Sequence, residues 1–241
     1  SSLECAGVMF MGTNVKAKEL NYDSYAMKKY DQDIVNSIPG HREFHNKIRQ
    51  IVKKRFRGKE LNILELGIGT GLTSIEILKT ISPLRYVGVD FSQNMLFGAK
   101  QKLRKYDVTL LYGDYTKIKF PTQNDLIISV IGLHHQKTDQ DKKKLFKKIV
   151  QSLTPNGLFI FADLMSTKKK ELAALNEALH YHYLVERARD LKSLKEWAFH
   201  HKYLNNLASV EDQIRWLKGA GFRKVDLVFQ KFNTILLVAQ K

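Results

Sequence analysis

The segment from Asn62 to Gly71 constrains the fold of this chain more than any other part of the sequence. A short apolar run over 62–66 is followed by glycines at positions 67, 69 and 71. A glycine-rich turn directly after a buried strand lets the backbone approach a ligand closely, because glycine has no side chain in the way. The segment therefore predicts the first strand of a parallel sheet, with a small-molecule site at its carboxyl end.

Strands and helices alternate after this loop. Apolar runs predict strands over 86–90, 108–112, 125–131 and 158–162, with a turn at 155–157 before the last of them. Helices are expected between the strands, one over 73–80, one capped by Ser92 and one capped by Thr138 or Asp139. Alternation of this kind predicts an α/β fold with a mostly parallel sheet and helices on both faces.

Two helical regions lie outside this alternation. Residues 21–57 are expected to form an N-terminal helical cap, and 167–205 a helical lid insertion after the core at 58–165. The remainder, 206–241, predicts a helix capped by Ser209 with Asp212, and then apolar runs over 224–229 and 234–239 that suit an antiparallel pair. The whole chain, 1–241, is therefore expected to be a single domain with a seven-stranded sheet.

Composition excludes several classes of protein. Hydrophobic residues make up 44% of the 241 residues, which is too many for a disordered chain. The largely apolar run over 126–131 is far shorter than the roughly 20 residues of a membrane helix. A single cysteine, Cys5, excludes an internal disulfide and a cysteine-based zinc cluster, and the start of the chain shows no basic-then-apolar leader. We therefore expect a cytoplasmic protein that is not in a membrane.

The net charge of the chain is unusually high. Forty Lys and Arg against 24 Asp and Glu give +16, which favours an anionic partner such as RNA. Much of the excess lies at helix-surface spacing, as in Lys142 to Lys144 with Lys147 and Lys148, and is interpreted as a solvated helix face. Charge alone leaves both interpretations open.

The spacing of the glycines indicates which ligand the loop suits. A dinucleotide site needs Gly-x-Gly-x-x-Gly, and the last position of that pattern is Leu72 here. The observed pattern has Glu65 two residues before Gly67, followed by Gly69 and Gly71. We expect such a loop to bind a ligand without phosphates, whose amino-acid portion carries an ammonium group.

Acidic residues at the ends of the next two strands support the same site. Asp90 can accept hydrogen bonds from both hydroxyls of an adenosine ribose, since an ionised carboxylate offers only acceptors. Asp114 can accept from the adenine amino group, and Phe91 and Tyr115 could flank the ring. The ends of successive parallel strands converge on one crevice, which favours a shared site over separate helix caps.

With these motifs the sequence resembles the class I S-adenosyl-L-methionine (SAM)-dependent methyltransferases. The resemblance covers about residues 60–165 and the C-terminal strand pair, and it rests on the stretches ILELGIGTGL (63–72), VGVDFSQNM (87–95), YGDY (112–115), DLIISVIGLHH (125–135) and LTPNGLFIFAD (153–163). It implies a Rossmann-like sheet of order 3-2-1-4-5-7-6 with SAM as cofactor. The glycines would line the methionine part, Asp90 the ribose and Asp114 the adenine. Met95 and Val130, within these stretches, complete the predicted contacts around the loop.

Within this superfamily the sequence is similar to the small ubiquinone-biosynthesis-like branch, and residues 30–40 are also similar to carboxy-SAM synthases. This similarity implies that the N-terminal helices close over the cofactor, with Tyr22 or Tyr30 bonding its carboxylate. Core packing is the alternative for either tyrosine. No arginine is matched that would hold the extra carboxylate of carboxy-SAM.

The chemistry of methyl transfer makes histidines the candidate catalytic residues. A sulfonium makes the methyl group electrophilic, so catalysis needs acceptor, methyl carbon and sulfur in line, and frequently a base for the acceptor's proton. His134, after the fourth strand, and His201, in the insertion, are the predicted catalytic residues. No metal is expected, because His180 and His182 lie two residues apart on different helix faces and no His-x-x-x-His pattern has a carboxylate partner.

Three functions follow from these observations. The first is methyl transfer to an oxygen or nitrogen of a small-molecule acceptor, with residues 167–205 forming the acceptor pocket. The second is a tRNA- or RNA-modifying methyltransferase or a carboxy-SAM-type enzyme, which the net charge and residues 30–40 favour. The third is a SAM-binding subunit without catalysis, against which the intact loop and both acids argue.

Overall fold

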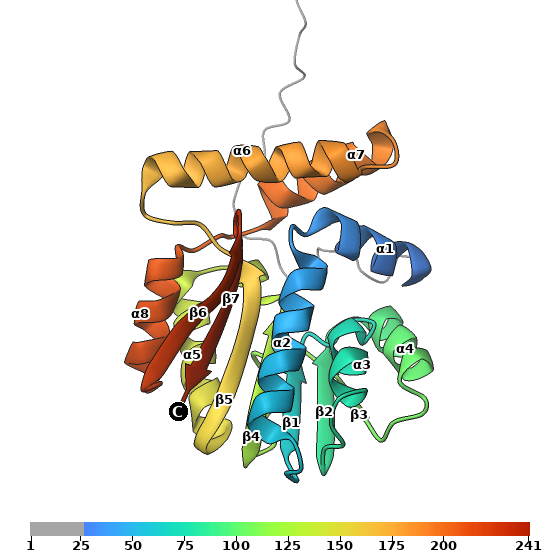
Figure 1. The fold of residues 1–241 in the computed structure, drawn as a ribbon, viewed down its shortest axis with the longest axis vertical. Coiled ribbons are helices and arrows are strands. Elements are labelled where there is room, and N and C mark those ends of the chain that lie inside the picture. The colour runs from blue at the N-terminus through green and yellow to red at the C-terminus, as the bar shows by residue number, and fades with distance from the viewer. Residues whose placement is uncertain (1–26) are drawn as a thin grey trace, which may run out of the picture.

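A computed structural model describes residues 27–241 and contains one seven-stranded sheet of order β3-β2-β1-β4-β5-β7-β6 (Figure 1). Strand β7 runs antiparallel to both of its neighbours, β5 and β6, and the other pairings are parallel. The predicted α/β fold class and strand order are therefore confirmed.

The element bounds agree closely with the expected alternation of strands and helices. The strands are β1 (Asn62–Leu66), β2 (Arg85–Asp90), β3 (Thr109–Tyr112), β4 (Asn124–Val130), β5 (Leu153–Leu164), β6 (Lys224–Lys231) and β7 (Thr234–Gln240). The helices are α1 (Met27–Ser37), α2 (His41–Phe56), α3 (Leu72–Leu78), α4 (Gln93–Lys102), the 3₁₀-helix η3 (Leu133–His135), α5 (Asp139–Ser152), α6 (Lys170–Arg187), α7 (Leu191–Phe199), the π-helix η4 (His200–Leu204) and α8 (Val210–Ala220).

Three helices begin at the side chains predicted to cap them. Ser92 Oγ accepts the backbone N–H of Met95 at 3.2 Å, which satisfies one of the donors left open at the start of α4. Thr138 and Ser209 cap α5 and α8 in the same way, each with a bond of 3.1 Å to an aspartate backbone three residues on. These caps explain why the helix starts could be predicted closely.

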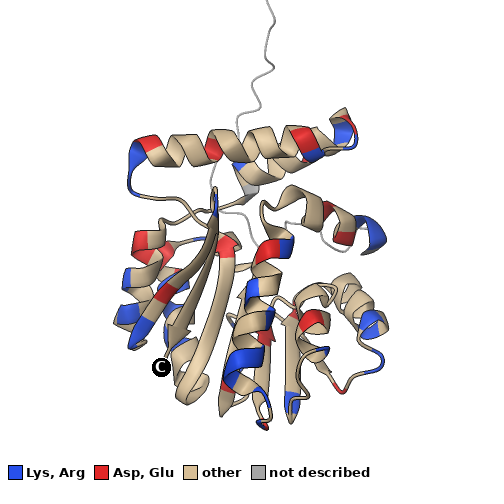
Figure 2. Cartoon of the chain, viewed as in Figure 1, with Lys and Arg blue, Asp and Glu red and all other residues tan. Residues whose placement is uncertain are grey.

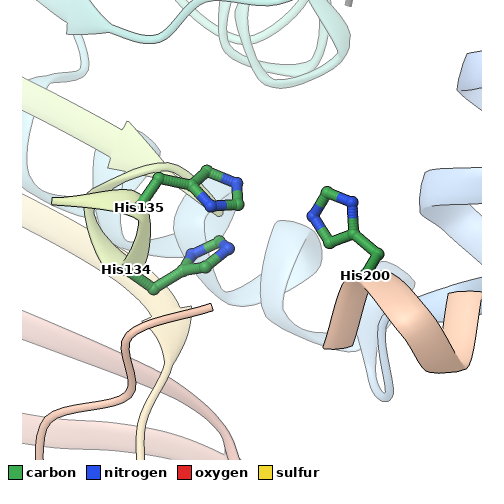
Figure 3. Close-up of side chains that lie close together, drawn as sticks. All are labelled: His134, His135 and His200. Carbon is green, nitrogen blue, oxygen red and sulfur yellow. The ribbon is translucent and has the colours of Figure 1, made fainter. Parts of the chain in front are cut away.

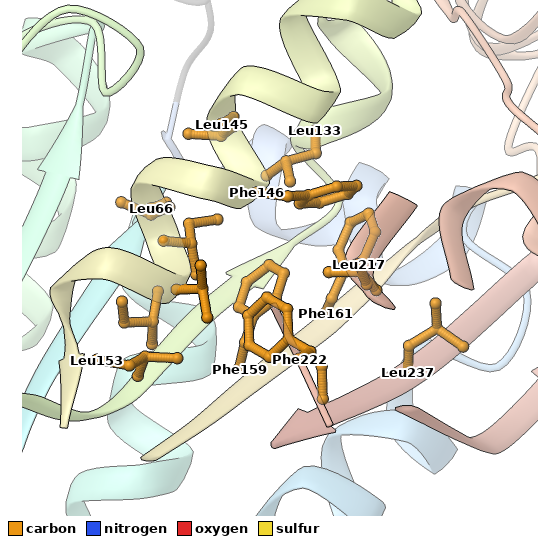
Figure 4. Close-up of a cluster of buried hydrophobic side chains, with 14 of the residues drawn as sticks. Leu66, Leu133, Leu145, Phe146, Leu153, Phe159, Phe161, Leu217, Phe222 and Leu237 are labelled. Atoms are coloured by element: carbon orange, nitrogen blue, oxygen red, sulfur yellow. The ribbon is translucent and has the colours of Figure 1, made fainter. Parts of the chain in front are cut away.

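The sheet separates two apolar cores. One lies against α5 and α8, and the other against α2, α3 and α4. Successive residues of β5 alternate between them: Phe159 and Phe161 pack with Phe146 of α5, while Ile160 faces the other core (Figure 4). Because side chains of a strand point to opposite faces in turn, a strand buried on both faces is apolar throughout.

The start of β5 differs from the expectation. The turn predicted at 155–157 is an irregular extension of the strand, which already pairs with β4 at Leu153. The register then shifts, so that Leu126 pairs with Leu158, and Asn156 absorbs the extra length with a φ of +64°. The turn-forming residues therefore make a bulge rather than end the pairing.

The interpretation of the α5 lysines as a solvated face is wrong for two of them. Lys142 is fully buried, and its Nζ donates to the backbone oxygen of Asn206 at 2.6 Å. Lys148 is half-buried and donates to the carbonyls of residues 115, 116 and 118 that follow β3. Lys144 and Lys147 are exposed, as expected. An amphipathic pattern cannot separate a solvated lysine from one that reaches carbonyl groups inward.

Helix α1 and the helices of residues 167–205 lie across the carboxyl ends of the strands (Figure 1). Arg189, just after α6, pairs with Asp33 of α1 at 2.9 Å. Helix α1 joins α2 at Gly40, whose φ of +74° is a left-handed conformation that glycine adopts readily; a Cβ at this position would lie 2.6 Å from the ring of Phe229. Among the described helices, none combines the length and apolar character that crossing a membrane requires.

Candidate functional site

A cavity of about 810 Å³ opens where β1, β2, β3 and β4 end, and we call it the cofactor cavity. Nine of the predicted cofactor residues line it: Tyr30, Gly67, Gly69, Asp90, Phe91, Met95, Asp114, Tyr115 and Val130. The strand ends therefore bring these residues together as expected, while their individual contacts with a ligand stay predictions.

The glycine loop is held open by its own conformation and by Asp90. Gly67, Gly69 and Gly71 have φ values of +73°, +55° and +82°, in the left-handed region that residues with a Cβ rarely adopt. The buried carboxylate of Asp90 accepts the backbone N–H of Gly69 at 2.8 Å and that of Ser92 at 2.9 Å. Asp90 thus fixes the loop to the end of β2 and presents a carboxylate to the cavity.

Asp114 is positioned by the turn after β3. Its Oδ1 accepts the backbone N–H of Thr116 at 2.9 Å and the hydroxyl of Thr116 at 2.6 Å. The adjacent Tyr115 is buried, and its hydroxyl donates to the carbonyl of Gly132 at 3.3 Å, so its ring stands as a wall beside Gly67. The bonds from Lys148 to the same turn hold the carboxylate and the ring in place.

Two predicted contacts, Glu65 and Gly71, do not lie on the cavity wall. Glu65 is buried behind the loop, where it accepts hydrogen bonds from Ser74 and Tyr86, and burial raises its pKa to about 7. Gly71 begins α3 and packs against Leu103. Both therefore shape the loop from behind, and a direct contact with the cofactor stays a prediction. Tyr22 lies outside the described residues.

Helix α1 covers the cavity and is attached to it by polar contacts. Asp31 pairs with Lys102 of α4 at 2.6 Å, and both bond to Thr70 of the glycine loop. Beside them, the hydroxyl of Tyr30 is 3.9 Å from where a Cβ of Gly69 would lie. This arrangement agrees with the expectation that the N-terminal helices close over the cofactor.

Sequence reasoning missed His41 and His45, which line the same cavity from α2. His45 Nδ1 donates to the carbonyl of His41 at 2.8 Å, so its Nε2 accepts from Thr73 at 3.0 Å. Burial, with the neighbouring His45, lowers the pKa of His41 to about 3. The spacing of four residues, which places both rings on one helix face, is the signal that could have found them.

A second cavity of about 80 Å³ adjoins the first beneath α7 and η4, and we call it the lid pocket. It shares four lining residues with the cofactor cavity: Tyr30, Ile34, Ile131 and His135. Its other walls combine apolar side chains with Trp197, Asn205 and several histidines. The Oδ1 atom of Asn205 is buried and makes no hydrogen bond within residues 27–241. A small ligand with a polar group would fit this environment.

Both predicted catalytic histidines line the lid pocket and are held by carboxylates. His134 is buried, and Asp163 binds both its Nδ1 and its backbone N–H, the latter at 2.8 Å. His201 Nε2 lies 3.0 Å from Glu177 Oε2. Burial lowers the pKa of His200, which precedes His201 on η4 and also lines the lid pocket, to about 4. The roles of His134 and His201 stay predictions, but their placement suits proton transfer.

Comparison with known proteins agrees with this architecture. Residues 63–157 match the family model described as a methyltransferase domain. The chain is 26% identical over 227 residues to the carboxy-S-adenosyl-L-methionine synthase of Nautilia profundicola, covering 93% of this chain and 95% of the relative. It is 28% identical over 233 residues to the enzyme of the same name from Helicobacter pylori, with the same coverage.

Solved structures share the fold at lower sequence identity. A protein of Bordetella parapertussis described as a potential exported protein superposes with a TM-score of 0.66 at 17% identity, covering 91% of this chain and 80% of that one. The N-methyltransferase NodS of Bradyrhizobium japonicum, solved with S-adenosyl-L-homocysteine, gives a TM-score of 0.57 at 15% identity, covering 84% and 86%. At these identities the likeness shows the fold alone.

Proposed function

We propose that this chain, which belongs to the class I SAM-dependent methyltransferases, transfers the methyl group of SAM to an oxygen or nitrogen of a small molecule bound in the lid pocket. The observation that carries this proposal is that the two cavities adjoin, since they share the lining residues Tyr30, Ile34, Ile131 and His135. A reactive methyl group needs its acceptor in contact and in line, and adjoining cavities meet that need.

The reaction moves one methyl group and one proton. SAM bound in the cofactor cavity would supply an electrophilic methyl group: an acceptor lone pair would form the new bond to its carbon, the carbon–sulfur pair would return to sulfur, and S-adenosylhomocysteine would leave. The acceptor's proton passes to a base, for which His134 and His201 are the candidates. In each, a carboxylate holds one ring nitrogen, Asp163 for His134 and Glu177 for His201. A carboxylate partner fixes the tautomer and orientation of an imidazole.

Carboxy-SAM synthesis is the second candidate, because the chain resembles carboxy-SAM synthases over almost its full length. An additional carboxylate on the cofactor calls for a cation beside the methyl position. Among residues 27–241, no arginine lines either cavity, and the cations of the cofactor cavity are lysines, Lys117, Lys137, Lys144 and Lys148. The nearby Arg189 is engaged by Asp33. We therefore rank this activity below methyl transfer.

An RNA acceptor is supported by the distribution of charge. Lys and Arg are numerous along α2 (Figure 2), where Arg42, Lys47, Arg49, Lys53, Lys54 and Arg55 are exposed. The lid pocket, however, is small and lies beneath helices rather than beside α2. A gel shift with bulk tRNA at low salt tests this partner, and an absence of binding removes it.

Acceptor screening tests the first proposal directly. Purified protein is incubated with SAM and pools of small oxygen and nitrogen nucleophiles, and both S-adenosylhomocysteine and carboxylated SAM are sought by mass spectrometry. We expect methylated acceptor with S-adenosylhomocysteine in equal amount. Carboxylated SAM without a methylated acceptor would establish the second candidate instead.

Once an acceptor is found, Trp197→Ala tests the lid pocket. We expect the KM for the acceptor to rise by about tenfold or more, since Trp197 is buried in the pocket wall, while the SAM Kd is unchanged. Circular dichroism checks the fold of the variant. An unchanged acceptor KM would place the acceptor elsewhere.

A further inference from the structure

Three histidines from two distant segments meet where the cofactor cavity and the lid pocket join. His134 and His135 lie on η3, directly after β4, and His200 is the first residue of η4. One ring nitrogen from each of the three lies within 4.8 Å of the other two. Figure 3 shows the rings of His134 and His135 side by side, with His200 pointing toward them from the opposite segment.

We propose that His134, His135 and His200 form a binding site for a divalent transition-metal ion of the zinc type. Imidazole nitrogens are ligands that Zn²⁺, Co²⁺ and Ni²⁺ accept, and three of them with one open position is the ligand set of a reactive rather than a purely structural zinc site. The expectation from sequence was no metal, because no His-x-x-x-His pattern has a carboxylate partner, and the structure now brings three histidines together from separate segments.

Asp163 gives the strongest support for a ligand role over simple packing. Its buried carboxylate binds His134 Nδ1 and also accepts the backbone N–H groups of His134 and Leu164, at 2.8 and 2.9 Å. His134 therefore donates through Nδ1, and its Nε2 is left as the electron-pair donor. A carboxylate on the second nitrogen is the arrangement that orients most metal-ligating histidines and raises their basicity.

The distances require a modest closing movement. Zinc–nitrogen bonds of about 2.0–2.1 Å in a tetrahedron place the donors about 3.3 Å apart, so the rings must approach by up to about 1.5 Å. His200 is the ring free to supply most of this movement, because it belongs to the helical insertion, whereas η3 is fixed to β5 through Asp163. A π-helical turn often marks a functional position of this kind. Binding an ion would therefore fasten the insertion to the sheet.

One consequence rests on the proposed function. With His134 as a ligand, His201, which also lines the lid pocket, is the remaining predicted base, and the ion would place positive charge beside the acceptor. Metal binding itself does not depend on that reaction.

Cobalt spectroscopy tests the site without activity. Untagged, EDTA-treated protein is titrated with Co²⁺ in the absence of SAM, and then competed with Zn²⁺ while visible absorption is followed. We expect the intense visible bands of a low-symmetry nitrogen-bound Co²⁺ site at one equivalent, and their loss on adding zinc. His200→Gln and His135→Ala should each weaken binding by about 100-fold or more, and Asp163→Asn by about 10- to 100-fold.

His182→Ala is the matched control, because this histidine is exposed on α6, pairs with Glu186 and lies outside the cluster. It should bind Co²⁺ like the parent protein. Equal binding by His200→Gln and the parent, or no binding by a folded parent, would overturn the site. Calorimetric titration of SAM in EDTA tests the cofactor cavity separately, so failure of the metal site and failure of the proposed function remain distinct.

Discussion

The cofactor cavity and the lid pocket are built in different ways. The cofactor cavity depends on backbone: three left-handed glycines, and carboxylates at the end of β2 and just after β3 that bind nearby N–H groups. The lid pocket depends on side chains carried by helices, which meet only after α1 and the insertion fold across the sheet. The first is fixed by short segments of sequence, and the second by tertiary packing. This difference implies that substitutions in the two should affect binding and turnover separately.

The largest difference between the effect on turnover and the effect on SAM binding is expected from His201→Ala. Loss of this proposed general base should lower kcat by about 10²–10⁴-fold while the SAM Kd is unchanged, because His201 lies in the lid pocket and not in the cofactor cavity. Steady-state kinetics with the acceptor found by screening, and calorimetry with SAM, give the two quantities. His182→Ala, exposed on the same insertion, is the control. A parallel loss of SAM affinity would show that the two regions are not separate.

Asp90→Ala should have the converse effect. It removes a buried carboxylate that fixes Gly69 and is expected to bind the ribose, so SAM affinity should fall by about 100-fold or more. Calorimetric titration measures the Kd. Asp226→Ala, on β6 and paired with Lys224 at the surface, should match the parent. Equal affinity for Asp90→Ala and the parent would remove this residue from the site.

A core substitution shows how far stability is concentrated in the sheet. Phe161→Ala should lower the free energy of unfolding by about 3–5 kcal/mol, because the ring is fully buried between α5 and β5. Phe199→Ala, on the insertion and 42% exposed, should change it by less than about 0.5 kcal/mol. Urea unfolding followed by circular dichroism compares them. Similar losses for both would mean that the insertion folds as part of the same core.

Glu65→Gln tests the buried carboxyl group behind the glycine loop through the pH dependence of stability. The carboxyl pKa is about 7 in the folded protein against 4.5 normally, so the folded state holds the proton more tightly. Stability is therefore lost as pH rises from about 4.5 to about 7, by at most about 1.4 kcal/mol per unit. The variant should lack this loss. Urea unfolding at about pH 5 and about pH 7 measures it, and an identical pH dependence in both proteins would contradict the shift.

The smallest effect is expected from Lys102→Met, which removes the ion pair between α4 and Asp31 of α1. Partly exposed pairs contribute at most about 1 kcal/mol, so SAM affinity should fall only a few-fold. Lys100→Met, exposed on the same helix, controls for loss of charge. If neither Lys102→Met nor Lys100→Met changes the SAM affinity, α1 stays closed over the cavity without this ion pair.

The two regions also differ in what could be predicted. The helix caps and the glycines and acids of the cofactor cavity follow from local rules, since a glycine loop and strand-end acids are adjacent in sequence to the strands that position them. The strand order, and Tyr30, Met95 and Val130 as cavity residues, were instead implied by the resemblance to a known superfamily. Glu65 was expected to contact the cofactor because spacing gives position but not side-chain direction; its side chain points to Ser74 and Tyr86. His41 and His45 were missed because their spacing of four residues places both rings on one face of α2 but does not say that this face meets the loop.

The histidine cluster could not be predicted for a different reason. His200 is 65 residues from His135, and their approach depends on how α7 continues into a π-helix and crosses the strand ends. Lys142 illustrates the same limit: within α5 it looks like its exposed neighbours, and only the position of Asn206 gives its charge an internal partner. Such contacts are properties of the folded chain.

The left-handed glycine between α1 and α2 has a consequence for the pace of turnover. Helix α2 is packed on the sheet through Phe44 and Ile48, whereas α1 roofs the cofactor cavity with Tyr30 and Ile34. We expect exchange of spent for fresh cofactor to need movement of α1, with the left-handed turn at Gly40 as the joint. Crowding against Phe229 makes that joint intolerant of any larger residue. We expect product departure, gated at this joint, to limit the number of catalytic cycles per second.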